Sequence, residues 1–409
     1  MKTGIWFLMV ICFVAAGWSP GAGLPGTVQW RMIAYGAGTA DEDTEEMDMF
    51  DSVEAALGGE QVENWGDIDR FLQDGTEGLG QDLSFTELVK KLMAGEGRQA
   101  GRMLLDAARQ ALFKEVSNGG RMAGQLLALG LIGAVFANFS EIFSGNQISE
   151  TGFFMTYLMA FTVLAASFFE STRIALEVLE QQVLFMKVLL PSYFLAVAWA
   201  GASASSAAWY EVVLFLIAAV QWLYLNLLMP LVRVYILLVM AGHMAKEDML
   251  SKLTELLRTG IQWGTRSLIG LVLGFQLIQG MVLPYADAVK SVGVQKLLQV
   301  IPGIGAGAGA VTKLILGSGV LIKNTMGAAA VLILILLSLV PVLKLVVLLI
   351  MYRTVAAVLE PVADKRLVGC ISGVADGQKL LLGLVVSGLL LFVITIALIC
   401  TGTNVSYLA

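Results

Sequence analysis

The chain has 409 residues, of which 57% are hydrophobic and only 14% are charged, and its formal net charge is −6. A water-soluble domain carries roughly 25% charged residues, so this composition excludes an ordinary soluble protein. The cationic side chains do not gather into a basic surface of the kind that binds nucleic acid. The apolar residues form runs of about 20, the length that a helix needs to cross a bilayer. The composition therefore predicts an all-α, multi-pass membrane protein.

The N-terminus has the pattern of an export signal. Lys2 provides a positive charge, residues 5–16 form a short apolar stretch, and small or helix-breaking residues fill 17–26. This three-part order is typical of a secretory signal peptide, which we assign to residues 1–23. The alternative is an uncleaved N-terminal anchor.

An acidic segment follows the predicted signal. Residues 24–120 contain 19 acidic and 8 basic side chains, a balance of −11. Within this range, low hydrophobicity and high charge predict a flexible extracytoplasmic segment at 24–83. Residues 84–120 then show the helical period of two amphipathic helices, and Ser84 with Glu87 has the spacing of a capping box.

The remainder, 121–409, is predicted to be the transmembrane domain. Pro230 should kink or divide the apolar stretch that contains it, because proline removes a helical hydrogen-bond donor. The glycine-rich run 300–322 is predicted to be either a re-entrant segment or an extra crossing. About seven transmembrane helices are predicted, at 122–142, 153–171, 183–203, 209–229, 265–284, 327–350 and 380–401.

Two basic segments bear on orientation. Residues 243–264 and 353–379 both carry lysine and arginine, and the positive-inside rule assigns both to the cytoplasmic side. A re-entrant 300–322 would keep the two segments on the same side, whereas a single full crossing there would separate them.

The sequence lacks the residue patterns of an enzyme. His243 is the single histidine, which excludes a multi-histidine metal site. Ser203 lies in a small-residue run with no nucleophile elbow and no acidic residue to orient a base, so a Ser/His pair is a weak alternative. There is no nucleotide-binding P-loop. We therefore predict a protein that is not an enzyme and holds no cofactor or metal.

The glycines of the 300–322 run have a different expected role. They follow no β-strand, so a dinucleotide loop is a poor interpretation. Spacing by four lets helix backbones approach closely in lipid. Hinge or close-packing residues are therefore predicted at Pro302, Gly303, Gly305, Gly307 and Gly309.

Charged side chains within the apolar runs are the strongest functional signal. A charge near the bilayer centre costs about 2.5–3.5 kcal/mol on insertion scales, so it normally faces a cavity or a partner. Six such residues are candidates to line a polar path, or else to pair helices: Lys187, Glu211, Arg233, Lys313, Lys323 and Lys344.

Several short segments resemble the stage III sporulation protein AE family of endospore-forming bacteria. The matching segments share an arrangement of proline, glycine and lysine within apolar sequence. They are Leu190-Pro191-Ser192-Tyr193, Pro302-Gly303-Ile304-Gly305, Leu316-Gly317-Ser318-Gly319, Leu321-Ile322-Lys323-Asn324 with Gly327, Pro341-Val342-Leu343-Lys344-Leu345, Tyr352, Ala356-Ala357 and Glu360-Pro361.

This resemblance implies a location and a role. Such proteins lie in the mother-cell membrane around the forespore, as permease-like subunits of a channel or secretion complex needed after engulfment. The implied partners are sister stage III sporulation A proteins, one of them ATPase-like, and indirectly stage II sporulation protein Q from the forespore. A self-sufficient secondary transporter is the alternative, because broken helices and buried charges also suit that class.

Overall fold

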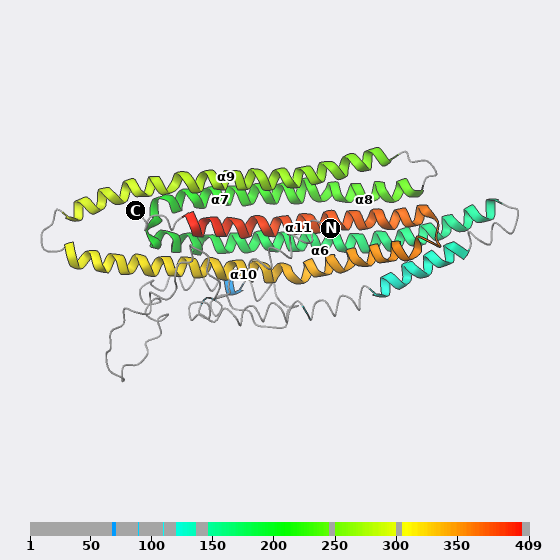
Figure 1. The fold of residues 1–409 in the computed structure, drawn as a ribbon, viewed down its shortest axis with the longest axis horizontal. Coiled ribbons are helices and arrows are strands. Elements are labelled where there is room, and N and C mark those ends of the chain that lie inside the picture. The colour runs from blue at the N-terminus through cyan, green and yellow to red at the C-terminus, as the bar shows by residue number, and fades with distance from the viewer. Residues whose placement is uncertain are drawn as a thin grey trace, which may run out of the picture. The chain divides into compact units, whose positions relative to one another are not determined.

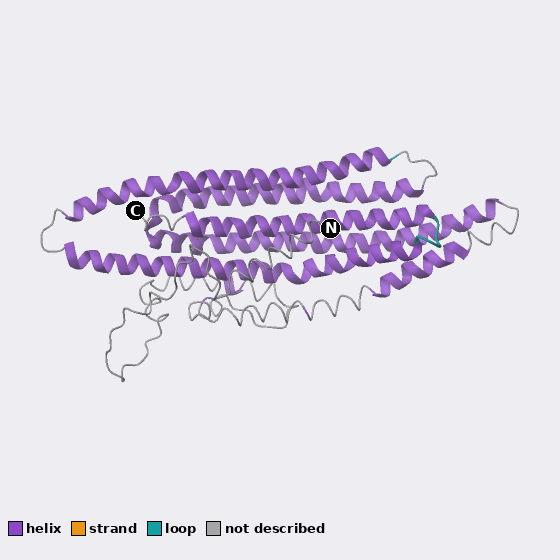
Figure 2. Ribbon diagram, in the orientation of Figure 1, coloured by secondary structure: helices purple, strands orange, loops and turns teal. Residues whose placement is uncertain are grey.

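Helices make up nearly all of the chain that the computed structural model describes (Figures 1 and 2). The described residues are 68–70, 89, 109, 120–135, 146–244, 250–299 and 305–402. No β-strand occurs in these ranges, so the all-α prediction is confirmed there. The predicted signal peptide and most of the acidic and amphipathic segments fall outside them. All elements below belong to one compact unit, residues 50–409, while the other unit, Met1–Met49, lies outside the described residues.

The first long helix, α6, runs without interruption through 52 residues from Asn146 to Val197. At 1.5 Å per residue it is about 78 Å long, more than twice the roughly 30 Å of a hydrocarbon core. Its continuity follows from its sequence, which has no glycine between 153 and 197 and a single proline, Pro191. The spans predicted at 153–171 and 183–203 therefore fall largely on one helix. They are not two antiparallel crossings.

The chain then turns back along α6. A π-helical segment, η2 (Ala198–Ala202), leads into α7 (Ser203–Leu223). The Lys187 ammonium on α6 donates to the Gln221 side-chain oxygen on α7 at 2.9 Å, which shows the two helices side by side. The separation predicted between 183–203 and 209–229 is present at this turn.

A second π-helical segment marks the position of Pro230. It is η3 (Tyr224–Leu228), and α8 (Met229–Met244) follows it directly. Proline cannot supply the backbone donor of a regular α-helix, and single π-turns often occur where the helical ladder is disturbed. The predicted division at Pro230 is thus a change of helical pitch and not a break in the helix.

Three helices complete the bundle: α9 (Ser251–Gln299), α10 (Gly305–Leu359) and α11 (Lys365–Gly402). The 55 residues of α10 include both the described part of the glycine-rich run and the span predicted at 327–350. The described part of the run therefore continues into the span predicted at 327–350, so neither a separate re-entrant segment nor an extra crossing is confirmed. α9 and α10 run in opposite directions. The start of α9 and the end of α10 therefore lie at the same end of the bundle.

Four helices are long and apolar enough to cross a membrane, judged by length and composition within the described ranges. They are Phe154–Ala200, Tyr210–His243, Gly317–Leu359 and Lys365–Cys400, and a shorter apolar helix covers Gly120–Val135. The described part of the chain is thus all-helical with four candidate membrane spans, and the predicted number of seven crossings is not confirmed. The span expected at 265–284 lies on α9, which is not among the four.

The core forms where α6, α10 and α11 meet. α11 packs against α6, α8, α9 and α10. The main apolar cluster joins the second half of α6, the middle of α10 and the end of α11; Ile68 and Val89, both fully buried, belong to it. At Gly319 a Cβ atom would lie 2.8 Å from the Trp199 carbonyl oxygen, so the backbones of α10 and η2 touch there.

Candidate functional site

Polar side chains on α11 contact a different neighbour at successive levels of the bundle. The Gln378 amide donates to the Leu345 carbonyl on α10 at 3.2 Å. Further along, Ser387 and Tyr224 of η3 share a hydrogen bond of 2.7 Å between their hydroxyls. The Gln276 amide of α9 donates to the Thr395 hydroxyl at 2.6 Å. α11 is therefore held on several sides by hydrogen bonds as well as by apolar packing.

At one end of the bundle, Asp376 binds two arginines from two other helices. Its Oδ2 lies 3.1 Å from Nη1 of Arg258 on α9, and its Oδ1 lies 2.9 Å from Nη2 of Arg353 on α10. The carboxylate is 22% exposed, and the arginines are 41% and 55% exposed. This cluster, which we call the Asp376 triad, ties three helices together and carries a net charge of +1. Arg258 belongs to the basic segment 243–264 and Arg353 to the basic segment 353–379. These two arginines therefore lie at the same end of the bundle.

At the other end, a buried lysine meets the last turn of α11. Lys323 on α10 has 0% exposure and donates from Nζ to the Cys400 carbonyl oxygen at 3.2 Å. The last carbonyls of a helix have no donor within the helix and form the negative end of its dipole. Lys323 is thus a cationic cap for α11. Beside it, the Tyr193 hydroxyl and the Cys400 thiol are 2.7 Å apart.

Four buried side-chain amide oxygens have no hydrogen-bond partner within the described part of the chain: those of Gln182, Gln276, Asn324 and Gln378. In each of the three glutamines the amide nitrogen is used, for example by Gln182, which donates to Ser338 at 2.9 Å. A buried carbonyl oxygen left without a donor is costly. Such oxygens can accept hydrogen bonds from water or from a polar solute between the helices.

The six predicted charged residues occupy different environments. Lys323 is buried, Arg233 and Lys344 are half-buried, and Lys187 and Glu211 are exposed; Lys313 lies on α10, and its side chain is outside the described part. Lys187 is bound to Gln221, as noted above, and the polar contacts seen for the described side chains join no two of the six. Whether these residues line a polar path or pair helices stays a prediction.

Arg233 is the one of the six whose side chain has a buried nitrogen without a hydrogen-bond partner in the described part of the chain. Its Nε is buried and unpaired within the described residues, in a small pocket of α6 and α8 lined by Phe168, Phe169 and Met240 among others. A buried guanidinium nitrogen without a hydrogen-bond partner among the described residues is costly and could bind a polar group.

The predicted hinge residues are in part outside the described structure. Gly305, Gly307 and Gly309 lie in the first turns of α10, whereas Pro302 and Gly303 fall in the undescribed range before it. A close approach of backbones occurs further along, at Gly319, which the spacing argument did not select.

Asp376 was missed by the sequence analysis. Arg258 and Arg353 were considered only as markers of orientation, and the acidic residue that binds both was not considered. Asp376 lies shortly before the uncharged run 380–401 in the sequence. An acidic residue at the edge of an apolar run needs a cationic neighbour, so this position predicts an ion pair.

The described residues bear on the predictions about metal ligands and about His243. They contain no group of three or more His, Cys, Asp or Glu side chains suited to hold a metal ion. The His243 Nδ1 lies 2.7 Å from the Val239 carbonyl oxygen of its own helix, and Gly369 packs against its ring. This arrangement uses the imidazole as a packing group between α8 and α11.

Comparison with known proteins identifies the family. The family model described as stage III sporulation protein AE matches residues 83–403. The stage III sporulation protein AE of Bacillus subtilis (strain 168) is 24% identical over 304 residues, which is 74% of this chain and 76% of that protein. No solved structure matches. Because the family model covers well over half of the sequence, the chain belongs to the stage III sporulation protein AE family, as its proline, glycine and lysine segments predicted.

Proposed function

We propose that this protein is a membrane-embedded, permease-like subunit of a multiprotein channel or secretion complex between mother cell and forespore, required after engulfment. The observation that carries the proposal is the family match over residues 83–403, which implies a role in sporulation. The mother-cell membrane around the forespore is the proposed location.

The polar interior favours a conduit over a passive anchor. Polar groups between apolar helices are costly and normally have a function. Here Lys323 is fully buried, and four amide oxygens, including those of Gln182 and Gln378, have no partner within the described residues. The amide nitrogens of the glutamines join helices, and their free oxygens leave acceptors that a polar solute or water could use.

The proposed partners are other stage III sporulation A proteins, including an ATPase-like sister, with an indirect link to stage II sporulation protein Q. The sequence has no nucleotide-binding P-loop, so energy for transport would have to come from such a partner. The protein itself is proposed to catalyse no reaction.

A self-sufficient secondary transporter is the second candidate. The half-buried Arg233, with its unpaired Nε, is the observation that favours it, because transporters bind charged substrates between helices at membrane depth. Solute flux by the purified protein alone in liposomes would support this function, and flux only with sister proteins would support the channel.

The proposed function is tested by deletion and complementation in the spore-forming host. We expect the deletion strain to grow normally but to arrest after engulfment, with heat-resistant spores reduced at least a thousandfold. The wild-type gene should restore spores, and so should Lys252→Gln, a control at a lysine whose side chain is 94% exposed. Normal spore yield in the deletion strain would refute the proposal.

A further inference from the structure

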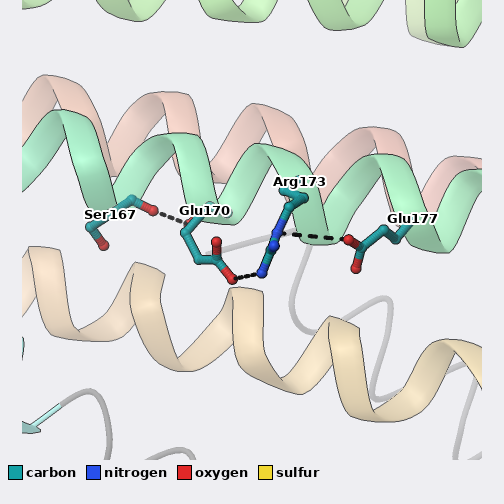
Figure 3. A network of polar contacts seen from close by, with 5 residues as sticks. Ser167, Glu170, Arg173 and Glu177 are labelled. Carbon is teal, nitrogen blue, oxygen red and sulfur yellow. Dashed lines mark hydrogen bonds and ion pairs between the residues drawn. The ribbon is translucent and has the colours of Figure 1, made fainter.

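The exposed side of α6 is charged in its middle and apolar toward both ends. Glu170, Arg173, Glu177 and Glu180 are all exposed, and we call these four the α6 acidic patch. Arg173 pairs with Glu170 at 2.6 Å and with Glu177 at 3.7 Å, and the side chains lie on one side of the helix (Figure 3). With three acids and one base, the patch keeps a charge of −2.

The position of the α6 acidic patch along the bundle axis, which we call its depth, can be given by the α11 residues beside it. Phe168 of α6 packs at Gly377, and Leu179 packs at Gly388, so the two helices run parallel and in step. The α6 acidic patch therefore lies beside α11 residues 379–389, at the start of the uncharged run 380–401. Exposed charges at that depth cannot face lipid without a large cost, so protein or water must cover them.

An exposed cation on another helix lies at the same depth. Arg258 of α9 pairs with Asp376, and Gln276 pairs with Thr395, so α9 also runs parallel to α11. Interpolation between these contacts puts Arg266 beside α11 residue 384, within about one helical turn (5.4 Å) of the depth of Glu177. The Arg266 side chain is exposed.

The two surfaces also match next to the charges. On α9, Trp263 lies one turn before Arg266 on the same side of the helix and is 72% exposed. On α6, Phe169 and Leu184 flank the acidic patch and are 50% and 51% exposed. Large apolar side chains around a charged centre are typical of a protein contact surface.

We propose that the α6 acidic patch of one copy binds the α9 surface around Arg266 of a second copy, with Glu177 and Glu180 facing Arg266. Copies in a membrane are related by axes normal to the bilayer, so surfaces that meet must lie at equal depth, as these two do. Because the two surfaces differ, the contact is heterologous and repeats from copy to copy into a ring or an open array.

The direct test is cross-linking of full-length protein in membranes. Copies with Glu177→Cys and a first tag are coexpressed with copies carrying Arg266→Cys and a second tag, in a background in which Cys12, Cys370 and Cys400 are replaced. We expect a disulfide-linked dimer with both tags. The matched control, Lys252→Cys, lies on the exposed side of α9 at another depth and should give at least tenfold less product. Equal product from the two α9 positions, or none from either, would overturn the proposal.

Charge reversal provides an independent readout. Arg266→Glu should reduce co-isolation of two differently tagged copies at least tenfold, whereas Lys252→Glu should leave it unchanged. Combining Arg266→Glu with Glu177→Arg and Glu180→Arg should restore co-isolation, because opposite charges again face each other. Failure of this restoration, with thermal melting unchanged in all variants, would contradict the proposed contact.

Discussion

The two ends of α11 hold positive charge in contrasting ways. At the Asp376 triad, a carboxylate binds Arg258 and Arg353, and all three side chains keep contact with solvent. At the opposite end, Lys323 is fully buried and its ammonium donates to a carbonyl in the last turn of α11. Ion pairing stabilises charge at the first end, and the helix terminus does so at the second.

This difference indicates how well each end of α11 should tolerate amino-acid substitutions. An exposed ion pair contributes little, because water solvates the charges when the pair is lost. A buried charge has no such alternative, so loss or reversal of its partner is costly. The Lys323 end should therefore be much more sensitive to substitution than the Asp376 end.

The largest effect is expected for Lys323→Glu. The new carboxylate would face the Cys400 carbonyl, so two acceptors would meet in a buried site, at a cost of about 3–5 kcal/mol. Thermal melting and the yield of folded protein in detergent measure this loss. Lys252→Glu, at a lysine whose side chain is 94% exposed, is the control and should change melting little. Equal melting of the two variants would contradict the contrast between buried and exposed charge.

A smaller loss is expected at the close approach of α10 to η2. Gly319→Val should destabilise the fold by about 1–3 kcal/mol, because a side chain there meets the backbone of Trp199 and Ala200. Gly317→Val is the control two residues away, where a Cβ atom meets nothing within 4 Å. Melting curves that shift equally for both variants would show that the helices do not touch at Gly319.

The smallest effect is expected at the Asp376 triad. Asp376→Ala removes two partly exposed ion pairs and should cost about 1 kcal/mol. Because screening weakens exposed pairs, high salt should reduce the difference between variant and wild type. Lys379→Ala, which removes an exposed cation nearby, should melt like the wild type. A loss above that of Gly319→Val would mean that the triad is more than a surface clamp.

Composition and short segments were sufficient to predict the fold class and the family. Long apolar runs predicted membrane helices, and the segments around Gly303, Gly319 and Lys344 predicted the family that the comparisons show. The number of crossings was harder to predict. A hydropathy window measures apolar content, but it does not show whether the chain turns between two apolar runs. On α6 the charges at 170–180 resemble a loop, yet no helix breaker accompanies them.

The candidate site was only partly accessible to sequence reasoning. Lys323 stands out in the sequence as a charge within an apolar run, and the structure buries its side chain. Its acceptor, the Cys400 carbonyl, is a backbone atom 77 residues away, and sequence patterns do not show such a contact. The same limit applies to Asp376, whose role depends on three helices meeting at one level.

The continuity of α6 underlies both the depth comparison and the correction to the predicted crossings. It is tested most directly by the distance between spin labels at positions 158 and 195, two exposed leucines that lie 37 residues apart. In membranes, and with Cys12, Cys370 and Cys400 replaced, a continuous helix predicts a label separation of about 55 Å. A hairpin of two crossings would bring the same positions to neighbouring helices, about 10–20 Å apart, and that result would contradict the structure described above.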